Sequence, residues 1–204
     1  RLHGGLLAEV GEPQAAEVQL GRALASAVRA RDVRREALVS VDLFWNVGYN
    51  QARHKEALAM QPFVQAAVAR TEDGEAEAKL ATTLCLIRWA QGEYAAARAH
   101  GERALALGRM HGMSDGERAL QLNNLGLVIN DAGDPEAALE VYGESLALME
   151  QTFGAGHPHV AMVLNNRGNA HNDREAYEQA RGDFERSLSV WEAALGPNHG
   201  DLSY

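Results

Sequence analysis

Apolar residues recur along the chain at three- and four-residue steps, the spacing that places side chains on one face of an α-helix. Leu122, Leu125 and Ile129 show this spacing, and Ser114 before them can cap a helix N-terminus. Turns containing Gly, Pro and Asp separate such stretches. The pattern predicts antiparallel helix pairs over residues 32–50 with 54–70, 73–91 with 94–110, 115–131 with 135–153, and 158–173 with 177–195, after an incomplete pair over 1–10 and 13–30.

The same residue types return with a period of about 42. Leu122-Asn123-Asn124-Leu125-Gly126 recurs as Leu164-Asn165-Asn166-Arg167-Gly168, and Tyr142 corresponds to Phe184. Slightly shorter offsets extend the register upstream, and the slips fall in turns, where insertions cost little. Repetition at this period predicts a stacked array in which each unit packs on its neighbours. We expect one array over 1–204, with a partial repeat 1–31, repeats at about 32–72, 73–113, 114–156 and 157–198, and the start of a further helix at 199–204.

The repeat also resembles a known family. Leu122-x2-Leu125-Gly126-x2-Ile129 followed by Ala138-x3-Tyr142 resembles the tetratricopeptide pattern. The longer period and the linker from Gly154 to Pro158, which returns at Gly196 to His199, resemble the kinesin-light-chain type of these repeats. The stretch from Val47 to His54 resembles repeat regions behind serine/threonine kinase domains of some bacteria. The resemblance implies an all-α fold, a right-handed α-solenoid of antiparallel helix pairs that binds proteins or peptides.

Small and large residues alternate at the expected helix contacts. Gly126 and Ala138 permit close approach, and Tyr142 fills the space beside them. Several positions depart from this pattern. We expect their packing to be adjusted, or their guanidinium groups to reach water over buried stems. The departures are Trp45 and Cys85 at the site of Gly126 and Gly168, Arg167 at the site of Leu125, and Arg88 and His171 at the site of Ile129.

Composition narrows the function classes. The chain carries a net charge of −9 and has no clustered Lys/Arg run, so we expect no nucleic-acid partner. No apolar run approaches the roughly 18 residues that span a bilayer, and no signal-peptide pattern opens the chain. Cys85 is the single cysteine, which permits no intrachain disulfide and predicts a small buried hydrophobe. We expect a cytoplasmic protein without a membrane partner.

Nothing in the sequence predicts catalysis, a metal site or a cofactor. The eight histidines show no H-E-x-x-H arrangement and have no cysteine pair beside them. His157 and His159 flank a proline at a repeat junction, where a linker and capping role is expected. Arg181-Gly182-Asp183 spells a cell-adhesion tripeptide, but it falls inside an expected helix and we interpret it as chance. No nucleophile lies beside a base with supporting context.

The first helices of tetratricopeptide repeats line a concave groove, and the register transfers that surface to this chain. Asparagine dominates it, and an Asn side chain can pair with any extended peptide backbone. Tyr49 and Trp89 offer apolar anchors. The alternative is that these asparagines bond to neighbouring helices or water, which we favour for Asn124 and Asn166. The expected groove residues are Asp42, Asn46, Tyr49, Asn50, Thr82, Leu86, Trp89, Asn123, Leu127, Asn130, Asp131, Asn165, Asn169, Asn172 and Asp173.

We expect a non-catalytic interaction module that holds a neutral or basic peptide or partner protein. The alternative is the sensor or docking region of a larger bacterial signalling protein, such as a serine/threonine kinase or a regulatory ATPase. The chain begins at Arg1 without Met and ends at Tyr204 inside an expected helix, so we interpret it as a fragment. Its apolar ends, with Leu2, Leu6 and Leu7 on one side and Phe184, Leu188 and Trp191 on the other, predict weak self-association.

Overall fold

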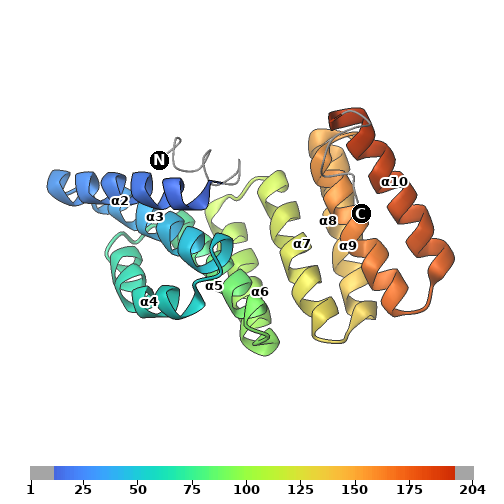
Figure 1. Ribbon diagram of the computed structural model, residues 1–204, viewed down its shortest axis with the longest axis horizontal. Helices are drawn as coiled ribbons and strands as arrows, with labels where there is room; N and C mark the ends of the chain where they lie inside the picture. Colours follow the sequence, from blue (N-terminus) through green and yellow to red (C-terminus); the bar gives the residue numbers. More distant parts are fainter. Residues whose placement is uncertain (1–11, 196–204) are drawn as a thin grey trace. The chain divides into compact units, whose positions relative to one another are not determined.

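The computed structural model describes residues 12–195, and every regular element in that range is a helix (Figure 1). The predicted all-α solenoid of antiparallel helix pairs is therefore confirmed for these residues. The expected helix over 1–10 and the helix start at 199–204 lie outside the described residues, as do Leu2, Leu6, Leu7 and His199. The chain divides into two compact units, Arg1–His111 and Gly112–Tyr204, which are described separately.

The first unit packs its helices around α3 and α5. Helix α3 contacts α2, α4 and α5, and α5 contacts α6. Its core contains Phe44, Val41 and Ile87, all fully buried, together with the buried Ala57 of α4. The helices are α2 (Pro13–Ala30), α3 (Val33–Trp45), the π-helix η1 (Asn46–Asn50), α4 (His54–Ala69), α5 (Gly74–Ala90) and α6 (Tyr94–His111).

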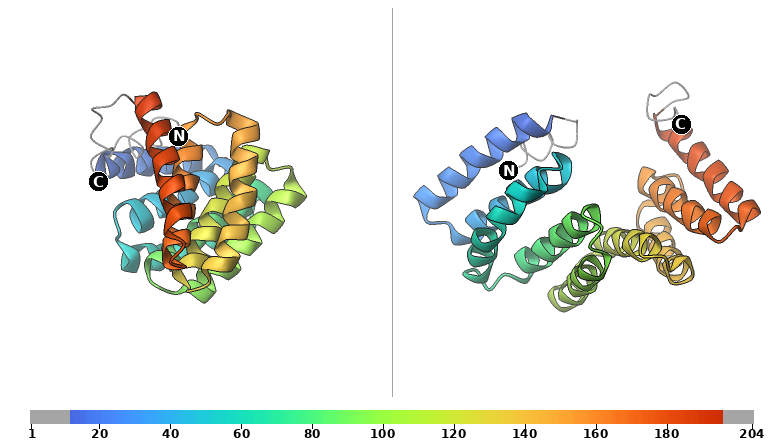
Figure 2. Two further views of the ribbon diagram at one scale, coloured as in Figure 1. Left: turned by 90° about the vertical axis from the view of Figure 1, so that its right-hand side faces the viewer. Right: turned by 60° about the horizontal axis from the view of Figure 1, so that its bottom comes forward.

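The second unit consists of two helix pairs. Helix α7 packs on α8 and α9 packs on α10, while α8 and α7 both contact α9. Neighbouring helices in the chain run antiparallel (Figure 1, Figure 2). Their bounds match the predicted ones at both ends: α7 (Asp115–Asp131), α8 (Pro135–Phe153), α9 (Pro158–Asp173) and α10 (Tyr177–Leu195).

Capping side chains fix where the first helix of each pair begins. Asp32 accepts a hydrogen bond from the backbone N–H of Arg35, and Asp73 accepts one from Glu75. Ser114 and Glu117 form a reciprocal capping box at the start of α7. His157 takes this position before α9, and its Nδ1 accepts from the backbone N–H of His159 at 3.2 Å. The capping role expected for His157 is present.

The π-helix η1 changes the repeat register of the first helix pair by one residue. Trp45 follows its N-cap, Asp32, by 13 residues, as Leu86 follows Asp73 and Leu127 follows Ser114. The assignment of Trp45 to the site of Gly126 is therefore wrong: the fully buried Phe44 takes that site. The physical reason is one extra residue in this helix, which η1 absorbs by winding more widely. The shift of one residue turns the Trp45 ring onto the face that also presents Tyr49.

The second departure from the pattern, Cys85 on α5, is accompanied by a glycine on α6. Cys85 is 1% exposed, as predicted for a small buried hydrophobe. In the register that aligns Ala97 with Ala138, the buried Gly101 of α6 stands where Tyr142 stands in α8. In this repeat the larger residue, Cys85, lies on the first helix of the pair and the glycine lies on the second.

Arg167, at the site of Leu125, does not direct its guanidinium to water. Its Nε and Nη2 donate to the two carboxylate oxygens of Asp183 at 2.7 and 2.5 Å. Asp183 is 7% exposed and lies on α10, so the pair joins α9 to α10. The hydrogen bond to Asp183 is the main cause of a raised pKa for Arg167. Burial of Asp183 also removes the tripeptide 181–183 from use as an exposed adhesion loop.

Candidate functional site

Three expected groove residues form an exposed row on α9. Asn165, Asn169 and Asn172 are all exposed and lie at steps of four and three residues, on one side of the helix. Helix α9 packs on α10 through its buried residues, where Phe184 lies against Gly168. These asparagines therefore have no packing role in the described structure. With neighbouring residues of α7 and α9 they define a surface that we call the α7–α9 face: Leu127, Asn130, Asp131, Asn165, Asn169, Asn172 and Asp173.

Two hydrogen bonds join α7 to α9 beneath this row. The Asn166 amide donates to Asn123 Oδ1 at 2.9 Å, and the Asn130 amide donates to Asp173 Oδ2 at 2.7 Å. Asn123 is only 3% exposed, so it serves this helix contact and presents little surface to a ligand. For Asn166 the expected structural role is present. Register predicts the face of a side chain, whereas the partner across the helix contact depends on packing.

The C-terminal ends of α7 and α9 bring two carboxylates together. Burial is the main cause that raises the pKa of the Tyr142 hydroxyl above its usual range, and the charges of Asp131 and Asp173 raise it further. Both exposed carboxylates thus act on the same buried ring. Helix C-termini add a partial negative charge at the same place. Negative charge is therefore concentrated at this end of the α7–α9 face.

The first unit presents an aromatic cluster made of Trp45, Tyr49 and Trp89. The rings of Trp45 and Tyr49 are stacked with centroids 6.0 Å apart, and Tyr49 and Trp89 are tilted with centroids 6.5 Å apart. All three residues are half-buried, and burial raises the pKa of the Tyr49 hydroxyl. A constant repeat offset does not predict Trp45 as a surface residue, because it cannot detect the extra residue in η1. A count from the N-cap identifies it.

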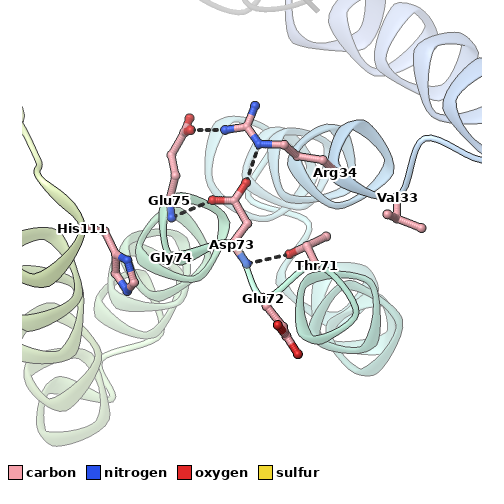
Figure 3. A pocket seen from close by; sticks show the side chains of 8 residues that line it. All are labelled: Val33, Arg34, Thr71, Glu72, Asp73, Gly74, Glu75 and His111. Atoms are coloured by element: carbon pink, nitrogen blue, oxygen red, sulfur yellow. Dashed lines mark hydrogen bonds and ion pairs between the residues drawn. The ribbon is translucent and has the colours of Figure 1, made fainter.

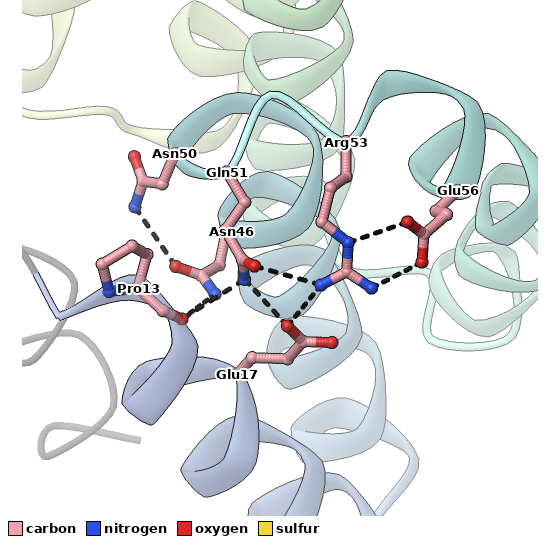
Figure 4. Close-up of polar contacts among 7 residues, drawn as sticks. All are labelled: Pro13, Glu17, Asn46, Asn50, Gln51, Arg53 and Glu56. Atoms are coloured by element: carbon pink, nitrogen blue, oxygen red, sulfur yellow. Dashed lines mark hydrogen bonds and ion pairs between the residues drawn. The ribbon is translucent and has the colours of Figure 1, made fainter.

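The remaining expected groove residues of the first unit form hydrogen bonds or ion pairs within that unit or are buried in it. Asn46 is fully buried and donates to the carbonyl of Pro13 at 2.8 Å, and Asn50 donates to Asn46 (Figure 4). Asp42 forms an ion pair with Lys79. Thr82 is half-buried and donates to the carbonyl of Ala78, and Leu86 is 8% exposed.

The Asn46 contacts belong to a larger network that joins α2 to the start of α4. Arg53 pairs with Glu17 at 2.6 Å and with Glu56 at 2.5 Å, while Gln51 donates to Glu17 (Figure 4). These bonds hold the η1–α4 turn against α2. Asn46 thus has the alternative role considered for the asparagines, as a bond to a neighbouring helix, and Asn50 bonds to Asn46 within η1.

An open pocket of the first unit lies where α3, α5 and α6 approach one another (Figure 3). Arg34 donates to Asp73 at 2.6 Å and to Glu75 at 2.5 Å, and Asp73 caps α5. The His111 ring occupies the space that a side chain on Gly74 would need. Arg34, Asp73 and Glu75 are paired with each other, and the residues that line the pocket form no nucleophile–base arrangement.

Among residues 12–195, no group of three or more His, Cys, Asp and Glu side chains has the arrangement of a metal site. Burial raises the pKa of the Cys85 thiol to about 12, so the thiolate needed for nucleophilic chemistry is scarce at neutral pH. No helix in the described range is long and apolar enough to cross a membrane.

Comparison with known proteins agrees with this architecture. Residues 117–181 match the tetratricopeptide repeat family. No curated protein matches the sequence.

Two solved structures share the fold over most of the chain. BtubC (BKLC) from P. vanneervenii is 21% identical, with a TM-score of 0.70 over 90% of this chain and 78% of that one. A putative kinesin light chain from Podosopora anserina, with nearly identical TPR-like repeats, is 16% identical, with a TM-score of 0.67 over 94% of this chain and 93% of that one. Such arrays are generally scaffolds for protein–protein interaction. The chain thus contains tetratricopeptide repeats at residues 117–181, and its described helices share the fold of kinesin-light-chain-like repeats.

Proposed function

We propose that the chain is a non-catalytic module that binds an extended peptide or a segment of a partner protein along the first helices of its repeats. The observation that carries this proposal is the exposed row of Asn165, Asn169 and Asn172. Each of these amides offers two donors and an acceptor to a peptide backbone. They lie on a side of α9 that no described helix covers.

The aromatic cluster of Trp45, Tyr49 and Trp89 supports the same use in the first unit. Half-buried aromatic rings supply large contact area at low entropic cost, which suits an anchor for an apolar side chain. We propose these rings, with Asn50, Thr82 and Leu86 of the same unit, as a surface of the first unit that selects apolar residues. Asp42, Asn46 and Asn123 remain in the proposed surface as groups that hold its helices in place.

The test is selection of binders from a random peptide library on the full chain, followed by titration of the selected peptides against variants. Asn165→Ala with Asn169→Ala should weaken binding about tenfold or more and leave the melting temperature unchanged, since neither side chain packs within the protein. Gln179→Ala with Ser189→Ala, two exposed positions on α10, is the matched control and should change nothing. Equal effects of the two pairs would place the binding surface elsewhere.

The cellular setting is also proposed. We place the module in the cytoplasm and, as the alternative, within a larger bacterial signalling protein such as a serine/threonine kinase or regulatory ATPase. Leu188 on α10 is 45% exposed, and Phe184 and Trp191 beside it are half-buried. Weak self-association through this face stays a prediction, and light scattering over a concentration series of the parent and of Leu188→Glu tests it.

A further inference from the structure

The charge of the chain is concentrated in one of its two units. Residues 1–111 contain 14 Lys and Arg against 13 Asp and Glu, which is close to balance. Residues 112–204 contain five Arg, no Lys and 15 Asp and Glu. The second unit therefore carries a net charge of −10 and the first a net charge of +1, which together give the −9 of the chain. A partner that responds to charge will distinguish the two units.

The basic side chains of the second unit are already used inside it. Each of its five arginines forms an ion pair with a carboxylate of the same unit. The pairs are Arg118 with Asp115 and Glu144, Arg167 with Asp183, Arg174 with Glu136, Arg181 with Glu178, and Arg186 with Glu150.

The α7–α9 face combines this excess with groups that recognise a polypeptide. None of its residues is basic, and Asp131 and Asp173 stand at its end, where both carboxylates act on Tyr142. Asn130 donates to Asp173 through its amide, while its own carbonyl oxygen is buried and accepts no hydrogen bond from the described residues. Ammonium and guanidinium groups supply several donors and a positive charge at one point.

The dimensions fit a short extended segment. From Asn165 to Asp173 the helix rises by about 12 Å, and an extended chain covers that length with about four residues. A segment of this length can therefore pair its backbone with the asparagine row and place a basic side chain at the acidic end.

Resting on the peptide-binding function proposed above, we infer that the α7–α9 face docks a basic extended polypeptide segment, whose Lys or Arg side chains lie over Asp131 and Asp173. The near-neutral first unit contributes no charge selection. Charge complementarity raises the association rate and excludes acidic segments, because like charges across an interface repel.

The experiment uses the full chain and two synthetic peptides with the same Gly/Ser framework, one with regularly spaced lysines and the other with glutamine at those positions. The lysine peptide should bind about tenfold more tightly, and added salt should reduce that difference because it screens exposed charges. Asn165→Lys with Asn169→Lys should weaken the lysine peptide about tenfold, from the Coulomb repulsion of two added charges. Asp173→Asn, which can still accept from Asn130, should weaken it several-fold.

The matched control is Gln179→Lys with Ser189→Lys, which adds the same charge on α10, away from the α7–α9 face. A loss of less than about threefold there supports a local docking surface, since exposed charges beyond a Debye length are largely screened. Equal affinity for the two peptides, or equal losses for the two lysine pairs, overturns the inference. If library selection still returns peptides whose binding needs Asn165 and Asn169, only the basic preference fails. If it returns none, the proposed function fails with it.

Discussion

The ring of Tyr142 occupies the space into which a side chain on Gly126 would project. A Cβ atom built on Gly126 would lie 2.6 Å from Cε1 of Tyr142, and the same relation holds between Gly168 and Phe184. Tyr142 is 1% exposed, so its ring has no free volume to enter. Gly126→Leu should overpack this contact and lower the free energy of unfolding by roughly 1–3 kcal/mol or more, as measured by chemical denaturation.

Gly143, in the middle of α8, is the matched control for this substitution. A Cβ atom there would meet nothing within 4 Å. Gly143→Leu should therefore leave stability unchanged or raise it by about 0.5–1 kcal/mol, because a helical glycine is entropically costly. If both variants lose stability to the same degree, the α7–α8 contact is not the cause.

Cys85 and Gly101 take the positions that Gly126 and Tyr142 have in the second unit, with the larger residue on the other helix. Substitutions at these two positions should therefore have coupled effects on the free energy of unfolding. Cys85→Gly should leave a void, and Gly101→Tyr should overpack the α5–α6 contact, so each single change is destabilising. Together they recreate the small-to-aromatic arrangement of Gly126 and Tyr142. The double variant should be more stable than the sum of the single effects by about 0.5–3 kcal/mol in a double-mutant cycle. Strict additivity would show that the two positions do not share a contact.

The sequence predicts the helices well because their ends are marked by local chemistry. Ser114 with Glu117 begins α7, and the turn at Gly133, which has a positive φ of 92°, ends the pair's first helix. The π-helix η1 is not predicted from the repeat offset, because one inserted residue can lie in a turn or within a helix. Counting residues from the N-cap Asp32 to the end of the helix distinguishes these two cases. The helix face on which Asn123 lies is predictable from the sequence. Its hydrogen bond with Asn166 is not, because that bond depends on how closely α9 approaches α7, and the residue pattern of a single helix does not give this distance.

The pair of Arg167 and Asp183 predicts a specific loss of stability in the second unit. Asp183→Asn keeps the shape of the side chain but leaves the half-buried guanidinium without a counter-charge. The free energy of unfolding should fall by about 1–3 kcal/mol, the range for hydrogen bonds to charged groups. Glu185→Gln, an exposed neighbour on α10, should change it by less than about 0.5 kcal/mol. Comparable effects of the two would contradict a stabilising role for the pair.

Three histidines predict the pH dependence of stability. Burial is the main cause that lowers the pKa of His100, His159 and His171 in the folded chain. The unfolded chain therefore binds more protons than the folded one once pH falls below the ordinary histidine pKa of about 6.5. Their stabilising contribution is present above that pH and is lost as pH falls through the folded values. Denaturation midpoints should decrease from about pH 7.5 to about pH 5, and a flat profile would contradict these shifts.

His157 holds the start of α9 through one hydrogen bond, because its Nδ1 accepts from the backbone N–H of His159. The equivalent positions before α3, α5 and α7 are taken by Asp32, Asp73 and Ser114, whose side-chain oxygens accept in the same way.

Removing the acceptor at position 157 tests this cap. His157→Ala should make the amide protons of the first turn of α9 exchange faster, by about the 1 kcal/mol of an N-cap, because the backbone N–H of His159 loses its partner. His157→Ser, which restores an acceptor, is the matched control and should keep the protection of the parent. Identical exchange of the parent and His157→Ala would show that the imidazole is not the group that holds this helix end.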